Sequence, residues 1–315
     1  MTNNKQLKLI VITGPTATGK SALGIQLAKQ IDGEIVSADS MQVYKYMDIG
    51  TAKPTLEERN AVSHHLIDFI HPSDDYSVVR YIKDASDCID DILQRGKQPI
   101  LVGGSGLYID SLLLGRTFSA RGDIELRNDL EEEYEKIGGE AMLIKLGTFD
   151  PKTADKLHAN DKKRIIRALE AYITTGKTIS EHDAETKAIP PKYNAIKYAL
   201  TFPDREQLYK KIDRRVDDMI LFGLVDEVNS LLKMGIQRKY TSMQAIGYKE
   251  LSAAISDGSD LDTAIEKIKM ESRRYAKRQL TWLRRDSNIT WIPVQSGLPR
   301  RLCSEIISSL VSGSQ

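Results

Sequence analysis

Residues 14–21 form the sequence feature that most constrains the fold of this chain. They read GPTATGKS and fit the phosphate-loop pattern G-x-x-x-x-G-K-[ST] at every position. The apolar run Leu7–Thr13, directly before them, is typical of a buried strand. The segment Ser21–Ile31, directly after them, has apolar residues at helical spacing. A strand, a glycine loop and a helix in this order predict a phosphate-binding loop.

The chemistry of this loop predicts that it binds a polyphosphate or a diphosphate. Its glycines let backbone N–H groups turn toward an anion, and the helix N-terminus adds partial positive charge. Lys20 would reach the terminal phosphates, and the Ser21 hydroxyl could hold Mg²⁺. The pattern leaves open which molecule carries the phosphates. The predicted diphosphate-binding residues of the loop are Gly14, Pro15, Thr16, Ala17, Thr18, Gly19, Lys20 and Ser21.

The composition is that of a globular protein with a substantial core. The 315 residues are 41% hydrophobic and 28% charged, and the formal net charge is +1. Cys88 and Cys303 are far apart and have no metal-ligand neighbours, which favours a reducing compartment. The first residues lack a signal-peptide pattern, and no apolar run approaches the roughly 20 residues of a membrane span. We therefore expect a cytoplasmic protein without membrane contact.

The distribution of apolar runs predicts an α/β fold with a helical insertion. Helical patterns separate the runs, which favours a parallel sheet covered by helices on both faces, as in P-loop NTPases. Residues 116–190 show helical periodicity and almost no strand signal. We therefore predict a core domain of residues 1–115 and 191–315, with a smaller all-helical domain at 116–190. The further predicted strands are Glu34–Ala38, Pro99–Val102, Ala195–Thr201 and Ile289–Val294.

The last third of the chain is predicted to be helical and basic. Arg205–Met234 has the pattern of one long amphipathic helix, which Gly235 would end. In Asp262–Asp286, apolar residues share one arc of a helix and basic residues occupy the opposite arc. That arc is either a solvated charged face or a surface for a nucleic-acid backbone. Its members are Lys267, Arg273, Arg274, Lys277, Arg278, Arg284 and Arg285.

Polar residues follow the second and third predicted strands. Ligands of parallel α/β sheets bind at the carboxyl ends of strands, so Asp39 is expected to share a cleft with the phosphate loop. Its carboxylate could hold Mg²⁺ together with Ser21, accept a proton from a nucleophile, or cap a helix. The glycine turn Gly103–Tyr108 lies at the same edge. The pair His64-His65 lacks the helical spacing of a metal site and is expected to be structural.

A set of motifs in chain order resembles the tRNA dimethylallyltransferase family, also called tRNA isopentenyltransferases. The resemblance covers essentially the full length. The motifs are GPTATGKS (14–21), DSMQVYKYMDIGTAKP (39–54), HHLID (64–68), VGGSGLY (102–108), KRIIRALE (163–170), IDRRV (212–216), QAIGYKE (244–250) and KRQLTWLRR (277–285).

The resemblance implies transfer of a dimethylallyl group from dimethylallyl diphosphate to N6 of adenine 37 in tRNA. The phosphate loop would then hold the diphosphate leaving group rather than ATP, with Mg²⁺ as the cofactor. Asp39 would act as the general base, with Lys20 and Arg215 neutralising the diphosphate. Gln42 would contact the edge of the extruded adenine. The implied tRNA-binding residues are Asp39, Ser40, Met41, Gln42, Ser105, Arg127, Lys163, Arg164, Ile165, Ile166, Arg167, Gln244, Gly247, Lys277 and Arg278.

Two other classes of protein remain open at this point. A small-molecule or nucleotide kinase with a helical lid would also have a phosphate loop, an Asp after the second strand and an inserted domain. It would not need the DSMQVY segment or the basic C-terminal helix. A non-catalytic RNA-binding module would have no use for Asp39 beside the phosphate loop. We expect the protein to act as a monomer on the anticodon stem-loop of tRNA.

Overall fold

Six parallel strands form one sheet in the described part of this computed structural model, which covers residues 9–115, 123–294, 303, 306 and 307. Their order is β3-β2-β4-β1-β5-β6, and every pair of neighbours is parallel. The predicted α/β parallel sheet is therefore confirmed. The strands are β1 Leu9–Thr13, β2 Gly33–Ser37, β3 His64–His65, β4 Gln98–Val102, β5 Ala195–Thr201 and β6 Ile289–Pro293.

Alternate residues of the strands bury two separate cores, one on each face of the sheet. Leu9 and Val11 pack with residues of α3 and α4, whereas Ile10 and Ile12 pack with Leu23 and Leu27 of α1. Side chains two residues apart in a strand share a face, so this division follows from strand geometry. The helices of this part of the chain are α1 Lys20–Gln30, α2 Leu56–Ala61, α3 Val78–Gln94 and α4 Gly106–Leu113.

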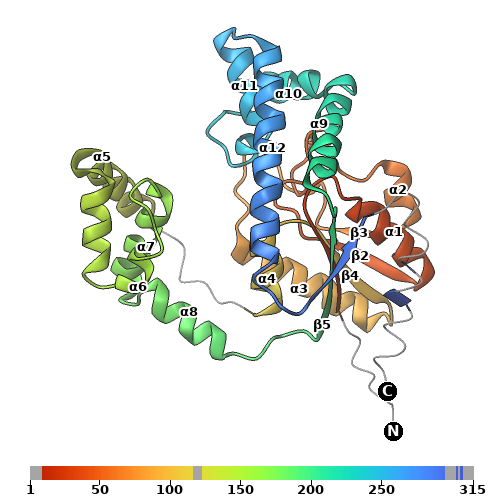
Figure 1. The fold of residues 1–315 in the computed structure, drawn as a ribbon, viewed down its shortest axis with the longest axis horizontal. Coiled ribbons are helices and arrows are strands. Elements are labelled where there is room, and N and C mark those ends of the chain that lie inside the picture. Colours follow the sequence, from red (N-terminus) through yellow and green to blue (C-terminus); the bar gives the residue numbers. More distant parts are fainter. Residues whose placement is uncertain (1–8, 116–122, 295–302, 304–305, 308–315) are drawn as a thin grey trace. The chain divides into compact units, whose positions relative to one another are not determined.

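Four helices after β5 pack against one another and gather at the top of the view in Figure 1. The prediction of a single helix over 205–234 is wrong, because the helix is interrupted at Gly223, which has a φ of 98°. A β-carbon makes that backbone conformation unfavourable, so glycine permits the break. The bounds are α9 Arg205–Leu221, α10 Leu224–Lys233, α11 Tyr248–Asp257 and α12 Leu261–Leu283, with a 3₁₀ turn η1 at Ser242–Gln244.

The chain divides into two compact units, Met1–Leu113 with Tyr193–Gln315 and Leu114–Lys192. The sequence placed these boundaries at 115/116 and 190/191. We call the first the core unit and the second the helical unit. The helical unit has its own apolar core, built around Leu146, Ile165 and Leu169. Its helices are α5 Ile124–Gly147, α6 Pro151–Ala154, α7 Lys162–Thr175 and α8 Ile179–Ala188.

Two further expectations concern the cysteines and the membrane. Cys88 is half-buried and Cys303 is buried, and both are free thiols. Among the residues with a described structure, no helix has the length and apolar character to cross a bilayer.

Candidate active site

The phosphate loop joins β1 to α1 and has little room for side chains. Gly14 has a φ of 139°, and a β-carbon there would lie 2.5 Å from the carbonyl oxygen of Leu200 on β5. Gly19 has a φ of 85° and precedes the first turn of α1. Thr18 closes the loop by donating its hydroxyl to the carbonyl oxygen of Pro15 at 2.8 Å. Both glycines therefore adopt conformations that favour glycine, as the predicted phosphate-binding loop requires, and anion binding by its N–H groups stays a prediction.

Two cations, Lys20 and Arg215, lie at this loop, and neither has an anionic partner among the described residues. Lys20 Nζ donates to the carbonyl oxygen of Pro15 at 2.7 Å. Burial and, secondarily, the charge of Arg215 lower the pKa of Lys20 to about 7, although Asp39 opposes the shift. Burial also lowers the pKa of Arg215. Within the described ranges neither cation forms an ion pair with a carboxylate, and an anionic ligand would relieve both.

Arg215 is held in place by its own helix. Two residues before it, Asp213 accepts from Arg273 of α12 at 2.5 Å. Two residues after it, Asp217 accepts from Lys269 of α12 at 2.8 Å. These ion pairs join α9 to α12 on both sides of Arg215. The sequence did not predict these two ion pairs, because nothing near a carboxylate on a helix indicates a partner that lies about 60 residues later.

Asp39 follows β2 and fixes a turn rather than a helix. Its Oδ1 accepts from the backbone N–H groups of Met41 at 2.9 Å and Gln42 at 3.4 Å. No helix begins there, so the helix-cap alternative is wrong. In the described part of the chain, no hydrogen bond occupies Oδ2. Ser40 donates its N–H to the Ser105 hydroxyl at 3.2 Å, which ties this turn to the second glycine turn.

The second glycine turn lies close against the Asp39 segment and α12. A β-carbon on Gly103 would lie 2.2 Å from the carbonyl oxygen of Ala38. A β-carbon on Gly104 would lie 2.3 Å from Nε2 of Gln279, which is buried and comes from α12. The weak glycine signal in the sequence is thus explained by close approach of three segments.

Gln279 and Tyr275 of α12 connect these segments. Gln279 accepts the N–H of Thr16 at 2.9 Å and donates to the carbonyl oxygen of Gly104 at 3.0 Å. Tyr275 lies beside Ser105 and Gln279 in the same wall, and burial raises the pKa of Tyr275 to about 12. Sequence reasoning found the motif around Gln279 but assigned no role to either residue. A buried Gln on a basic helix was the available signal.

These segments enclose a cavity of about 600 Å³ in the core unit. Lys20, Asp39 and Arg215 line it, and part of its wall is apolar, including Val216, Met219, Leu224 and Ile268. Five predicted residues of the core unit do not line it: Gly14, Pro15, Thr18, Ser105 and Lys277. The predicted residues that line it are Thr16, Ala17, Gly19, Lys20, Ser21, Asp39, Ser40, Met41, Gln42, Arg215, Gln244, Gly247 and Arg278.

The predicted RNA-binding segment of the helical unit includes two residues whose side chains are buried and cannot contact RNA. Ile165 and Ile166 are 0% and 3% exposed in the core of this unit, so their assignment to direct tRNA contact is wrong. Lys163 and Arg164, on the same first turns of α7, are exposed. Successive residues of an α-helix are about 100° apart, so one turn of α7 can carry both an exposed pair and a buried pair of residues.

Arg127 and Arg167 share one carboxylate. Glu170 is fully buried and accepts from Arg127 at 2.9 Å and from Arg167 at 2.8 Å. Their assignment to RNA contact stays a prediction, but half of their combined charge is already balanced by Glu170.

The basic arc of α12 is only partly free. Arg273 pairs with Asp213, and Arg274 pairs with Glu271 at 2.6 Å. Lys277 and Arg278 are exposed, and Arg278 also lines the cavity. The interpretation of a single basic face therefore overstated the charge available to a nucleic acid.

The His64-His65 pair belongs to the sheet. His65 Nε2 lies 2.8 Å from Glu34 Oε2, and His64 Nδ1 lies 2.7 Å from the carbonyl oxygen of Val62. Across the described ranges, no group of three potential ligands from His, Cys, Asp and Glu could hold a metal ion. Both residues form β3 beside β2, and His64 also lines the cavity, so the expected purely structural role stays a prediction.

Comparison with known proteins adds a family to this geometry. The sequence model of the IPP transferase family matches residues 42–286, and that of the isopentenyl transferase family matches residues 7–70. The chain belongs to the IPP transferase family. The first match spans Gln42, Gly103, Arg215 and Gln279, and the second spans the phosphate loop and Asp39.

Individual relatives of this IPP transferase cover nearly the whole chain. The tRNA dimethylallyltransferase of Carboxydothermus hydrogenoformans is 49% identical over 96% of each chain. The tRNA isopentenylpyrophosphate transferase of Bacillus halodurans has a crystal structure with a TM-score of 0.71, 41% identity and coverage of 98% of this chain and 96% of that one. A eukaryotic dimethylallyltransferase crystallised acting on tRNA has a TM-score of 0.82 and 33% identity, covering 98% of this chain and 80% of that one.

Proposed function

We propose that this protein transfers a dimethylallyl group from dimethylallyl diphosphate to N6 of adenine 37 in tRNA. The products are N6-isopentenyladenosine and diphosphate. The observation that carries the proposal is a cavity that brings together two cations, Lys20 and Arg215, one carboxylate, Asp39, and an apolar wall. Neither cation forms an ion pair within the described ranges. The names of the relatives support the same reaction.

The cationic end of the cavity would hold the leaving group. Backbone N–H groups of the phosphate loop, Lys20 and Arg215 would bind the diphosphate. As the C–O bond of the donor breaks, negative charge collects on the bridging oxygen, and these fixed positive groups stabilise it. The apolar side chains Val216, Met219 and Leu224 would contact the dimethylallyl chain. They would also keep water from the allylic carbon.

Asp39 would act on the nucleophile. The N6 amine of adenine forms the new C–N bond, and its proton passes to the free oxygen Oδ2 of Asp39. An exocyclic amine is a weak nucleophile, so a positioned base helps as the bond forms. The other oxygen, Oδ1, is held by Met41 and Gln42 and so sets the direction of Oδ2.

Mg²⁺ fits the oxygen donors at this site. The Ser21 hydroxyl and the Asp39 carboxylate line the same cavity, and Mg²⁺ prefers oxygen ligands. With two protein oxygens, the remaining ligands would be water and donor phosphates, as is usual for this ion. When bound, Mg²⁺ would neutralise part of the diphosphate charge. Binding it through Asp39 would compete with the role of that carboxylate as a base.

The RNA must present an unstacked adenine to the cavity. A single-stranded loop presents such a base at the lowest cost. Exposed basic side chains would bind the phosphate backbone: Lys163 and Arg164 in the helical unit, and Lys277 and Arg278 on α12.

Incubation with labelled dimethylallyl diphosphate and unmodified tRNA tests the reaction. We expect label in isopentenyladenosine after nucleoside analysis, and inorganic diphosphate should compete with the donor. Phosphoryl transfer from ATP to a small acceptor, without labelled nucleoside, would overturn the proposal in favour of a kinase.

A further inference from the structure

Glu227 of α10 binds a turn that borders the cavity. Its Oε2 accepts from the backbone N–H groups of Asp48 and Ile49, both at 2.8 Å, and its Oε1 accepts from that of Gly50 at 3.2 Å. The fully buried Tyr248 donates its hydroxyl to the same Oε1 at 2.5 Å. Four donors thus converge on one carboxylate, an arrangement that an uncharged amide cannot reproduce, because one of its two polar atoms donates.

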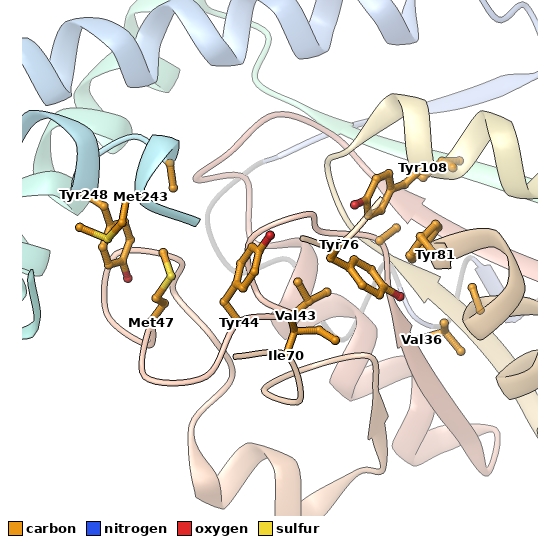
Figure 2. Packing of buried hydrophobic residues seen from close by; sticks show 14 of the residues in the cluster. Val36, Val43, Tyr44, Met47, Ile70, Tyr76, Tyr81, Tyr108, Met243 and Tyr248 are labelled. Carbon is orange, nitrogen blue, oxygen red and sulfur yellow. The ribbon is translucent and has the colours of Figure 1, made fainter. Parts of the chain in front are cut away.

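The turn is also packed against α11. A β-carbon on Gly50 would lie 2.5 Å from the ring of Tyr248, so only glycine fits there. Figure 2 shows the side chains of Met47, Met243 and Tyr248 close together, and the three belong to one buried cluster. The 48–50 turn is therefore held by α10 and α11, in addition to the ion pair between Asp48 and Lys53.

The residues directly after this turn fix the amide of Gln42. Its Nε2 donates to the carbonyl oxygens of Thr51 and Ala52, both at 3.2 Å. Carbonyl oxygens only accept, so the nitrogen of the amide must face them and the oxygen must lie on the other side. Oε1 receives a single long contact from the Ser37 hydroxyl, at 3.4 Å. Gln42 and Ser37 both line the cavity, so the group that Gln42 offers to a ligand is an acceptor.

An acceptor at this point distinguishes bases by the substituent at C6. Adenine presents an N–H donor there, guanine presents an oxygen acceptor, and unsubstituted purine presents neither. We propose that Glu227 is a positioning residue for base selection: by holding the 48–50 turn, it fixes Gln42 with its oxygen toward the N6 amine. This inference rests on the proposed function, because it requires an adenine in the cavity.

Binding of three anticodon stem-loop RNAs tests this role. The RNAs carry adenine, purine or guanine at the modified position, and their Kd values are measured without donor. For the wild-type protein we expect adenine to bind about tenfold tighter than purine, the effect of one hydrogen bond, and guanine to bind weakest. In Glu227→Gln the N–H₂ of the new amide would face a backbone N–H of the 48–50 turn, which cannot accept a hydrogen bond. The turn should therefore shift, and the preference for adenine over purine should fall to about twofold.

Asp226→Asn is the matched control. Asp226 precedes Glu227 in the first turn of α10 and is exposed, so this variant makes the same acid-to-amide change without touching the turn. It should keep the wild-type preference. The KM for dimethylallyl diphosphate should stay unchanged in both variants, because the diphosphate end of the cavity does not use this turn.

A double-mutant cycle separates positioning from general destabilisation. Gln42→Leu removes the acceptor, so it alone should abolish the preference for adenine over purine. If Glu227 acts through Gln42, adding Glu227→Gln to Gln42→Leu should change the preference no further. Tyr248→Phe, which removes one of the four donors, should give an intermediate loss and provides the readout if Glu227→Gln does not fold.

Two results would overturn the inference. One is that Glu227→Gln prefers adenine over purine as strongly as Asp226→Asn does. If Glu227→Gln does not fold, the same comparison is made with Tyr248→Phe. The other is an additive effect in the cycle. Failure of the proposed function itself would look different, because the wild-type protein would then transfer no label from the donor to tRNA.

Discussion

The cavity of the core unit and the α7 surface of the helical unit both carry cations, but they keep them in different surroundings. Lys20 and Arg215 are half-buried, neither forms an ion pair with a carboxylate of the described residues, and burial lowers the pKa of each. Lys163 and Arg164 are exposed to solvent. Desolvated cations gain strongly from a compact anion that reaches them, whereas solvated cations gain little from each phosphate. This difference supports the roles proposed above, in which Lys20 and Arg215 take part in the reaction and Lys163 and Arg164 bind the RNA backbone.

Asp39→Asn neutralises the carboxylate that is proposed as the general base and should have the largest effect. We expect kcat to fall by roughly 10²- to 10⁴-fold, the range for a positioned general base. The Kd for tRNA should change little, because the turn geometry set by Oδ1 is kept. Steady-state kinetics and filter binding check this. Asp226→Asn is the control, and turnover within about threefold of wild type would rule out the role of base.

Lys20→Ala should show most clearly that a cation in the cavity affects the reaction more than an exposed cation does. Loss of a desolvated cation at the leaving group should lower kcat/KM for the donor by about 10²- to 10³-fold, as for other electrostatic groups that act on the transition state. Lys29→Ala, on the exposed face of the same helix, is the matched control and should be near wild type. Equal effects of the two substitutions would mean that Lys20 is an ordinary helix residue.

The pH dependence of diphosphate binding should sharpen the contrast. The pKa of Lys20 is about 7 in the free protein, and a bound anion raises it, so binding takes up a proton above pH 7. Affinity should be constant below about pH 7 and should then fall, by up to about tenfold per pH unit. Calorimetric titrations with inorganic diphosphate check this in buffers of different ionisation enthalpy. Lys20→Ala reports the titration of the ligand itself, and an identical profile in both proteins would refute the assignment.

Substitution of the exposed cations should have the smallest effect. It should change the salt dependence of tRNA binding and leave the rate of the reaction unchanged. Replacing Lys163 and Arg164 by Ala should reduce the slope of log K against log salt for tRNA by about two units or slightly less. Adding Arg167→Ala should change the slope little more, since Glu170 already balances part of its charge.

The control for this pair is Lys152→Ala with Lys156→Ala, two exposed residues elsewhere in the helical unit. Donor KM should be unaffected throughout. If both pairs of substitutions lower the slope equally, α7 has no special place in the RNA interface.

Local signals in the sequence predicted the strands and the phosphate loop well, because each depends on a short run of residues. β5 begins and ends at the predicted residues, and the strand end and glycine turn around Asp39 and Gly103 meet as expected. The break at Gly223 was missed because the apolar pattern continues across it. The two-residue strand β3 is too short for any alternation to appear.

The supporting residues of the site could not be predicted in the same way. Glu227, Tyr275 and Gln279 act through partners far away in the sequence, such as Gly50, Ser105 and Thr16. Nothing near them in the chain marks those partners. The resemblance assigned RNA binding to the whole motif around Lys163–Arg167. The structure then shows that its cations Lys163 and Arg164 are exposed, whereas Ile165 and Ile166 are buried.

The order of the strands has a consequence for the protein as it leaves the ribosome. β1 pairs with β5, and the whole helical unit lies between them in the chain. The cavity also needs Gln279, near the end of α12. The helical unit has a core built from neighbouring segments, and such local contacts form early. During synthesis the helical unit can therefore fold before β5 and Gln279 have joined the phosphate loop. A nascent chain would then hold one finished unit while its cavity is still incomplete.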